Sequence, residues 1–217
     1  AQAVVDSQTQ IVVAAEVTNS ASDGAQLLPM LKQVLAMTGR LSGVFVADSG
    51  YWAMQAIALL LGAGVEVYVS QPRGKARNDI ANPYAKAQFT YDAAHDLYRC
   101  PAGQELRFVY YEHEAHGKPL EVAVYQCKGC VGCPGQQGGA CTTSKSGRRI
   151  KRYPADAQVP GYLEKLRSEE GQQAIRQRKS TVEPVFAMIK EHLGVRRFLL
   201  RGLENVRAEW DLTCVAH

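Results

Sequence analysis

The chain has 217 residues, of which 46% are hydrophobic and 21% are charged, and its formal net charge is +4. This length suits one sizeable domain, or a core domain that carries an insertion, and the composition disfavours a disordered chain. The longest apolar stretch, near Ala56–Ala63, is too short and too interrupted to cross a bilayer.

The chain opens with a pattern of two strands and a helix. Apolar residues at 3–5 and 11–15 flank a polar turn, which predicts a strand, a turn and a strand. Asp23 is a plausible cap for a helix whose apolar residues recur at helical spacing from Leu27 to Leu35, and Gly39 ends it.

After this helix the sequence predicts another strand, another helix and a further strand. Short apolar runs at 44–47 and 65–69 predict buried strands, with a helix over 52–61 between them. Such alternation implies an α/β sheet, and Asp48 would lie at the carboxyl end of a central strand, the edge where open α/β sheets bind ligands.

The composition changes after residue 70. Residues 88–150 are rich in Gly and Cys, with strand-like runs at 106–111 and 121–125, which predicts an insertion with its own small core. Helical patterns return at 162–177 and 182–193, and a last helix is expected near 205–215. We therefore expect a first core segment at 1–70, a Cys-rich insertion at 71–155 and a helical remainder of the core at 156–217.

Positive charge gathers in the last third of the chain. Residues 1–144 hold 10 Lys and Arg against 12 Asp and Glu, whereas residues 145–217 hold 15 against 9. A polyanionic partner fits this asymmetry, although solvated helix faces would give the same charge pattern.

Two carboxylates are candidates for metal-dependent chemistry. Asp48 ends a predicted strand and Glu183 lies in the later run Thr181–Phe186. Two carboxylates that the fold brings together can hold the divalent metals used in phosphoryl transfer. Alternatively, Asp48 caps the next helix and Glu183 lies in a first helical turn beside Pro184, where negative charge is favoured. Spacing alone favours this alternative.

Basic residues surround Glu183 in the sequence. Lys190 follows it by seven residues, close to two helical turns, so both can share a face and the ammonium could hold a phosphate. The neighbouring cations fit a DNA-binding groove around an acidic site: Arg178, Lys179, Arg196 and Arg197.

Five longer runs stand out along the chain: 6–19 (DSQTQIVVAAEVTN), 26–31 (QLLPML), 47–52 (ADSGYW), 182–186 (VEPVF) and 196–204 (RRFLLRGLE). In this order they resemble bacterial insertion-sequence transposases of the DDE superfamily, in the branch with a cysteine-bearing insertion. The likeness runs essentially from end to end of the chain.

The resemblance implies an RNase H-like fold, a mixed sheet flanked by helices, in which Asp, Asp and Glu bind magnesium. Asp48 matches the second Asp, Glu183 the Glu, and Lys190 the Lys that follows it. Related transposases place a Tyr and an Arg before the Glu, where this chain has Arg176 and Lys179.

No credible first catalytic Asp is found. In the family it lies on a strand upstream, and this chain begins as if in mid-strand, so we interpret it as an amino-terminally truncated fragment with impaired catalysis. Asp6 lies in the predicted turn and is a poor substitute.

The cysteines predict a second kind of site. Two overlapping Cys-x-x-Cys spacings are formed by Cys127, Cys130 and Cys133, and such spacings suit a tetrahedral zinc ion. A bound zinc ion would stabilise an insertion that is rich in loops. The preferred ligands are Cys100, Cys130, Cys133 and Cys141, with Cys127 in reserve. Buried free thiols and disulfides remain the alternatives, and a reducing cytosol disfavours disulfides.

Tyr51 and Trp52 directly follow Asp48 and could stack on an unpaired base, although packing beneath the next helix is the better interpretation for Trp52.

Together these features lead us to expect a DNA transposase catalytic domain that cleaves and transfers DNA strands with Mg²⁺ or Mn²⁺, with a possible structural Zn²⁺. Its partners would be insertion-sequence ends and target DNA, with a possible homodimer at synapsis. It would act in the bacterial cytoplasm on the nucleoid. The alternative is a catalytically inactive, zinc-stabilised DNA-binding remnant of a transposase.

Overall fold

The structure is a computed structural model that describes residues 1–72, 82–115, 118–130, 132–137 and 139–217. It divides into two compact units: the first comprises residues 1–71 and 158–217, and the second comprises residues 72–157. The sequence placed the insertion at 71–155.

The first unit contains two short sheets. Strands β1 (Gln2–Val5) and β2 (Val12–Glu16) pair antiparallel, and strands β3 (Val44–Ala47) and β4 (Glu66–Val69) pair parallel. The predicted strand, turn and strand at the amino end are confirmed. Asp6 closes the turn, because its Oδ1 accepts hydrogen bonds from the backbone N–H groups of Gln8 and Thr9.

Helix α1 (Leu27–Thr38) follows the first sheet and ends at Gly39, which adopts a left-handed φ of 72° as expected for a helix terminus. The predicted cap is wrong. Ser22, and not Asp23, caps a short 3₁₀ helix, η1 (Asp23–Ala25), and the Asp23 side chain is therefore free to accept from Gln2.

The predicted strand, helix and strand after Gly39 are confirmed, with a 3₁₀ turn added. Strand β3 leads into η2 (Ser49–Tyr51), then helix α2 (Met54–Gly62), and returns to β4. Ile57 of α2 and Val67 of β4 have no exposed surface, and they form the centre of the largest core cluster of this unit. Burial of these apolar faces stabilises the parallel pair.

The carboxy-terminal helices divide at a different place from the one predicted. Helix α5 (Val159–Arg167) ends at Ser168, and α6 (Glu169–Ala187) runs unbroken through the expected gap at 178–181. The break occurs at Ser168 because its hydroxyl accepts from the Gly171 N–H and caps α6. A π-helical segment, η5 (Met188–His192), and helix α7 (Leu203–Ala216) follow.

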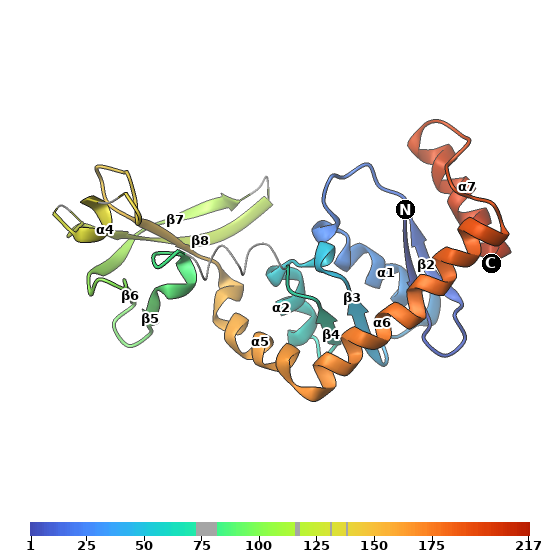
Figure 1. Ribbon diagram of the computed structural model, residues 1–217, viewed down its shortest axis with the longest axis horizontal. Helices are drawn as coiled ribbons and strands as arrows, with labels where there is room; N and C mark the ends of the chain where they lie inside the picture. The colour runs from blue at the N-terminus through green and yellow to red at the C-terminus, as the bar shows by residue number, and fades with distance from the viewer. Residues whose placement is uncertain (73–81, 116–117, 131, 138) are drawn as a thin grey trace. The chain divides into compact units, whose positions relative to one another are not determined.

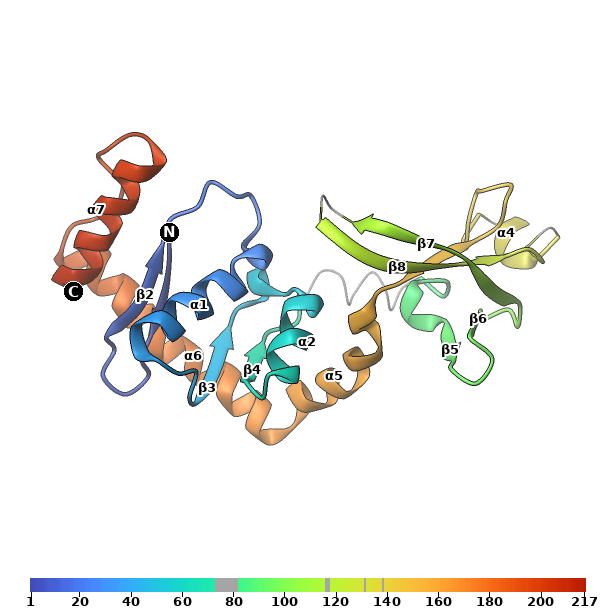
Figure 2. The ribbon, with the colours of Figure 1, turned by 180° about the vertical axis from the view of Figure 1, so that it is seen from behind.

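Two helices hold the two sheets of the first unit together. Helix α6 contacts β1, β3 and β4, and α1 lies against the β1–β2 pair (Figures 1 and 2). Val4 of β1 and Phe45 of β3 both pack against the cluster formed by Ala14, Met30 and Val34. The expected mixed sheet is thus divided into two halves, because no described strand joins β1 to β3.

The second unit is built on a five-stranded antiparallel sheet in the order β5-β6-β7-β8-β9. The long hairpin of β7 and β8 forms its centre, and its bounds extend the predicted runs at both ends. The strands are β5 (Thr90–Asp92), β6 (Leu97–Arg99), β7 (Glu105–Ala115), β8 (Lys118–Cys127) and β9 (Arg149–Arg152). Short helices η3 (Lys86–Gln88), α4 (Pro134–Gln137) and η4 (Pro154–Gln158) complete it.

Within the described ranges, no helix is both long enough and apolar enough to pass through a membrane.

Candidate active site

Asp48 lies directly after β3 and is exposed. Its Oδ1 accepts a hydrogen bond of 2.8 Å from the Gly50 N–H, so it caps η2, as the alternative interpretation of this residue predicted. This bond uses one carboxylate oxygen. Capping fixes the carboxylate at the end of the strand without neutralising it.

A second carboxylate, from Asp23, lies beside Asp48. A Cβ added at Gly50 would be 3.0 Å from Asp48 Oδ1 and 3.2 Å from Asp23 Oδ2, so the two side chains flank the same glycine. Asp23 is held there by Gln2, whose Nε2 donates to Asp23 Oδ1 at 2.7 Å. We call Asp23 and Asp48 the acidic pair.

The pKa of the Tyr51 phenol is raised in the surroundings of the acidic pair. Burial, and then the nearby Asp23 and Asp48 carboxylates, raise the pKa of Tyr51 far above its usual value. The phenol therefore stays protonated and can donate a hydrogen bond. The sequence did not indicate Asp23 as a site residue, because a role as a helix cap accounted for an Asp at that position. Its place beside Asp48 depends on contacts in the fold, such as the hydrogen bond from Gln2, which lies 21 residues earlier in the chain.

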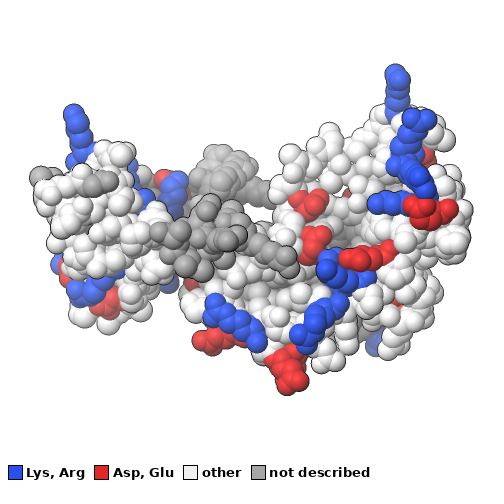
Figure 3. Space-filling view, in the orientation of Figure 1, with Lys and Arg blue, Asp and Glu red and all other residues white. Residues whose placement is uncertain are grey.

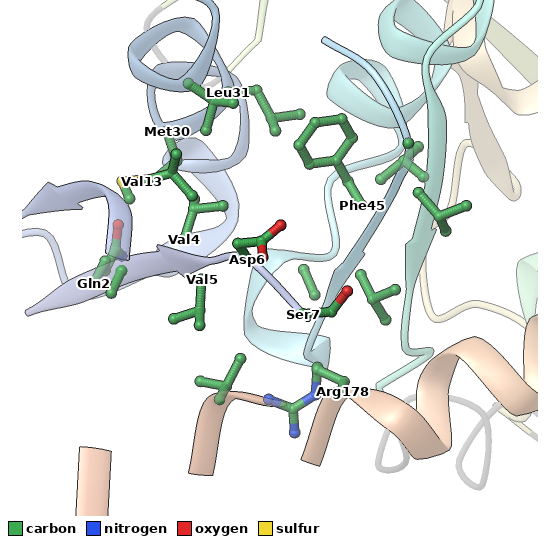
Figure 4. Close-up of a pocket in the computed structure, with 18 of the residues that line it drawn as sticks. Gln2, Val4, Val5, Asp6, Ser7, Val13, Met30, Leu31, Phe45 and Arg178 are labelled. Carbon is green, nitrogen blue, oxygen red and sulfur yellow. The ribbon is translucent and has the colours of Figure 1, made fainter. Parts of the chain in front are cut away.

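A cavity of about 740 Å³ opens between the two sheets of the first unit. Strands β1 and β3 form its sides, α1 covers it on one face and α6 on the other (Figure 4). Both members of the acidic pair are among its lining residues, with Tyr51 and Arg178.

Helix α6 turns a mixed face toward this cavity. Arg178, Val182 and Phe186, spaced four residues apart, line it, and the Arg178 guanidinium is its cation from this helix. Glu183 and Lys179 are exposed and do not line the cavity. The structure therefore brings Arg178 to the cavity that holds Asp48, and it records no contact between Glu183 and Asp48.

The expected surroundings of Glu183 need one correction. Glu183 lies near the end of α6 and not in a first turn, because the helix already begins at Glu169. Lys190 is exposed and lies in the π-helical segment η5. A π-helix has a slightly wider turn, so seven residues span a little less than two turns here, and the common face of Lys190 and Glu183 stays a prediction.

The segment between η5 and α7 presents further cations. Arg196 pairs with Glu191, whereas Arg197 is exposed. Glu209 of α7 holds the backbone of this segment, because its carboxylate accepts from the N–H groups of Leu199 and Leu200 at 2.8 and 2.9 Å. On one face of the first unit, acidic and basic side chains lie side by side (Figure 3).

Trp52 is half-buried against the core of the first unit. Its ring lies 5.8 Å from that of Tyr162 in α5, a tilted aromatic contact. This is the packing position that the sequence favoured for Trp52.

The cysteines of the second unit gather around one end of its core. Cys127 and Cys130 are buried, and Cys100 and Cys141 pack against them. The Cys133 N–H donates to the Cys130 carbonyl at 3.0 Å, which is the tight turn expected of a Cys-x-x-Cys spacing.

These thiols are free, as is Cys214, which packs beside the core cluster around Trp210. Burial raises the pKa of the Cys127 thiol well above its usual value. The Gln104 N–H donates to Cys100 Sγ at 3.2 Å, the kind of bond that supports a thiolate. Among the described residues, no three His, Cys, Asp or Glu side chains are arranged to hold a metal ion.

The first unit thus brings an acidic pair and the Arg178 guanidinium to one cavity of an α/β core. The chain belongs to the transposase DDE domain family, whose model matches residues 99–217, more than half of its length. This match contains Glu183 and Lys190 and begins after Asp48. No curated protein and no solved structure matches the chain.

Proposed function

We propose that the chain forms part of the catalytic core of a DNA transposase, which cleaves DNA strands at insertion-sequence ends and transfers them to target DNA. The observation that carries this proposal is the acidic pair at the end of β3, which lines the same cavity as Arg178. Family membership indicates the class of reaction, and we propose the acidic pair as the site at which that reaction takes place. An RNase H-like core is supported by the parallel pair β3–β4 and by α6, which contacts both sheets.

The acidic pair fits a divalent cation of the Mg²⁺ or Mn²⁺ type, because carboxylate oxygens are the ligands that such hard cations prefer. A bound cation would neutralise phosphate charge and activate the attacking oxygen. Asp48 and Asp23 would hold it, with Glu183 contributed from α6 as the family resemblance implies.

The cations and the phenol of this region would hold the DNA. Arg178 would position a phosphate in the cavity, and the Tyr51 hydroxyl would donate to a phosphate oxygen because it stays protonated. The exposed cations Lys179, Lys190, Arg196 and Arg197 would contact the DNA backbone outside it, so binding should weaken steeply with salt. A homodimer would bring two ends together, and light scattering of the DNA complex would measure it.

A structural zinc in the second unit is part of the proposal. Cys100, Cys130, Cys133 and Cys141, with Cys127 in reserve, supply soft thiolate donors at one end of its core. Elemental analysis should give one zinc per chain, lost in Cys130→Ser and kept in Cys214→Ser. Absence of zinc from protein purified with zinc in the medium would exclude this site.

A second candidate is a DNA-binding module without catalysis. It is favoured by the position of Glu183, which is exposed and does not line the cavity that holds the acidic pair. Such a protein would bind DNA with the same salt dependence but would not cut it.

The test is metal-dependent nicking of a DNA duplex that carries the element's terminal repeat, by protein expressed from the complete reading frame. Asp48→Asn retains an oxygen acceptor for the Gly50 N–H, so it removes the charge and spares the cap. Asp23→Asn and Glu183→Gln test the other carboxylates, and Glu164→Gln, an exposed residue of α5, is the matched control.

We expect nicking with Mg²⁺ or Mn²⁺ in the parent and the control, and its loss in Asp48→Asn with folding and DNA binding intact. Nicking that survives in Asp48→Asn would remove this residue from the active site. A folded parent that binds DNA and never nicks it would establish the binding module instead.

A further inference from the structure

Two neighbouring leucines are exposed in the segment that joins η5 to α7, which loops out beside α7 (Figures 1 and 2). The Leu199 side chain is 75% exposed and that of Leu200 is 51% exposed. Single exposed apolar residues are common on protein surfaces, but adjacent ones form a contiguous apolar surface that gains from a partner. We call Leu199 and Leu200 the leucine tip.

The backbone of the leucine tip is held from both sides. The Glu209 carboxylate accepts from both of its N–H groups, at 2.8 and 2.9 Å. Before the tip, the Phe198 ring packs edge-on against the buried Trp210, with 6.2 Å between ring centroids. After it, Asn205 Nδ2 donates to the Arg201 carbonyl at 2.9 Å. A segment anchored in this way can present its side chains to a partner with little further loss of conformational entropy.

Cations flank the leucine tip. Residues 190–201 contain four Lys and Arg against one acidic residue, Glu191. Glu191 is paired with Arg196, and the next acidic residue is Glu204, in the first turn of α7. All four cations are exposed: Lys190, Arg196, Arg197 and Arg201. This charge favours a polyanion as the partner of the segment.

Leucine side chains require apolar surface, and a DNA duplex offers it in two places. Thymine methyl groups line the major groove, and the faces of the bases become accessible where two base pairs separate. Proteins that bend DNA insert leucine and other apolar residues between base steps from the minor groove, beside Arg and Lys contacts. An anchored apolar tip between cations combines the features that such an insertion needs.

We propose that the leucine tip is a wedge that enters the minor groove of bound DNA and separates two stacked base pairs. Arg197 and Arg201, which flank the tip in sequence, hold the phosphates on either side. This inference rests on the proposed DNA-binding function and extends it, because the wedge deforms the duplex and kinks it by roughly 20–90°. Pyrimidine–purine steps unstack most easily, so the wedge selects such steps without a hydrogen bond to any base.

The test measures unstacking and bending of DNA in the absence of metal ions. Protein expressed from the complete reading frame is titrated onto duplexes that carry the terminal repeat and its flanking DNA, with 2-aminopurine in place of one adenine at a time. The fluorescence of 2-aminopurine rises when its base unstacks, and energy transfer between dyes on the duplex ends reports the bend. Without metal no strand is cut, so the outcome is independent of the nicking assay.

The variant Leu199→Ala/Leu200→Ala removes the wedge and spares the hydrogen bonds that hold its backbone. Leu212→Ala, at a 71% exposed leucine of α7, is the matched control. We expect the parent and the control to unstack one step and bend the duplex, and the double variant to lose both signals while its affinity keeps the same salt dependence. Its affinity should change by less than roughly tenfold, because the lost apolar contact and the avoided unstacking offset each other. Arg197→Gln should instead reduce the salt slope by about one.

DNA binding by the parent without unstacking at any position, or unstacking that the double variant retains, would overturn the wedge and leave the proposed function standing. A parent that binds no DNA would overturn both. If uracil in place of thymine weakens binding by the parent alone and no base unstacks, the tip contacts thymine methyl groups in the major groove instead. If no base unstacks and sedimentation shows a DNA-free dimer that the double variant abolishes, a second copy of the chain covers the tip.

Discussion

Replacing Tyr162 by Phe tests how α5, and through it α6, is fixed to the sheet of the first unit. The Tyr162 side chain is 2% exposed, and its hydroxyl accepts from the Val69 N–H at 2.7 Å and donates to the Val67 carbonyl at 3.4 Å. Both partners belong to β4. Burial raises the pKa of Tyr162 to about 12, so the phenol is neutral at ordinary pH.

Tyr162→Phe keeps the ring, and with it the contact with Trp52, and removes only the hydroxyl. The Val69 N–H is then buried without a partner, which costs about 1–3 kcal/mol. For a chain of this size each kcal/mol lowers Tm by about 2–4 °C. We therefore expect a fall in Tm of roughly 2–12 °C, most of it from the shorter of the two bonds.

Urea unfolding and hydrogen exchange at the Val69 amide measure the effect together. Tyr110→Phe is the matched control, because Tyr110 is 40% exposed and no hydrogen bond of its hydroxyl occurs within the described residues. An unchanged Tm and an unchanged Val69 exchange rate in Tyr162→Phe would refute the reasoning and assign the attachment of α5 to apolar packing alone.

Three other predictions concern the second unit and the basic segment. Gly147→Ala, at φ 87°, adds a Cβ that overlaps the Cys127 carbonyl, so it should cost about 2 kcal/mol or more, whereas Gly139→Ala, at φ 66° with open space, should cost only about 1 kcal/mol; equal losses in denaturation would contradict this. Glu209→Gln should speed amide exchange in the segment it holds, and unchanged exchange there would show that the carboxylate is dispensable. In zinc-free protein, the raised pKa of Cys127 means that its stabilising contribution is present below the unfolded thiol pKa and is lost as pH rises above about 8.5; Cys127→Ala should flatten that alkaline decline, and an identical decline would exclude the thiol as its source.

Local patterns predicted the elements of the first unit well because each has a strong local cause. Gly39 ends α1 through its left-handed conformation, and the turn at Asp6 is closed by its own side chain. The helix break was expected at 178–181, around the basic run that contains Arg178, and it falls instead at Ser168, whose side chain caps α6. In the structure this run is helical, and Arg178 lines the cavity.

The candidate site could be predicted only in part. The position of Asp48 could be predicted because it directly follows an apolar run, and the strand that this run forms determines where the residue lies. Asp23 could not be predicted as its neighbour, because their proximity depends on η1 and η2 meeting in the fold. Nor could the sequence reveal the cavity, because the strands on its two sides are separated by α1 in the chain.

The π-helical segment η5 lies at the end of the long helix that α6 begins, and it affects how that helix tolerates a change in length. A π-turn takes about one residue more than an α-turn to complete one rotation. Deleting one residue within 188–192 would therefore restore α-helical pairing and leave the chain beyond it in nearly the same direction. A one-residue deletion within regular α6 would instead rotate all that follows by roughly 100° about the helix axis, so η5 is the place where this helix can change length without redirecting α7 and the basic segment before it.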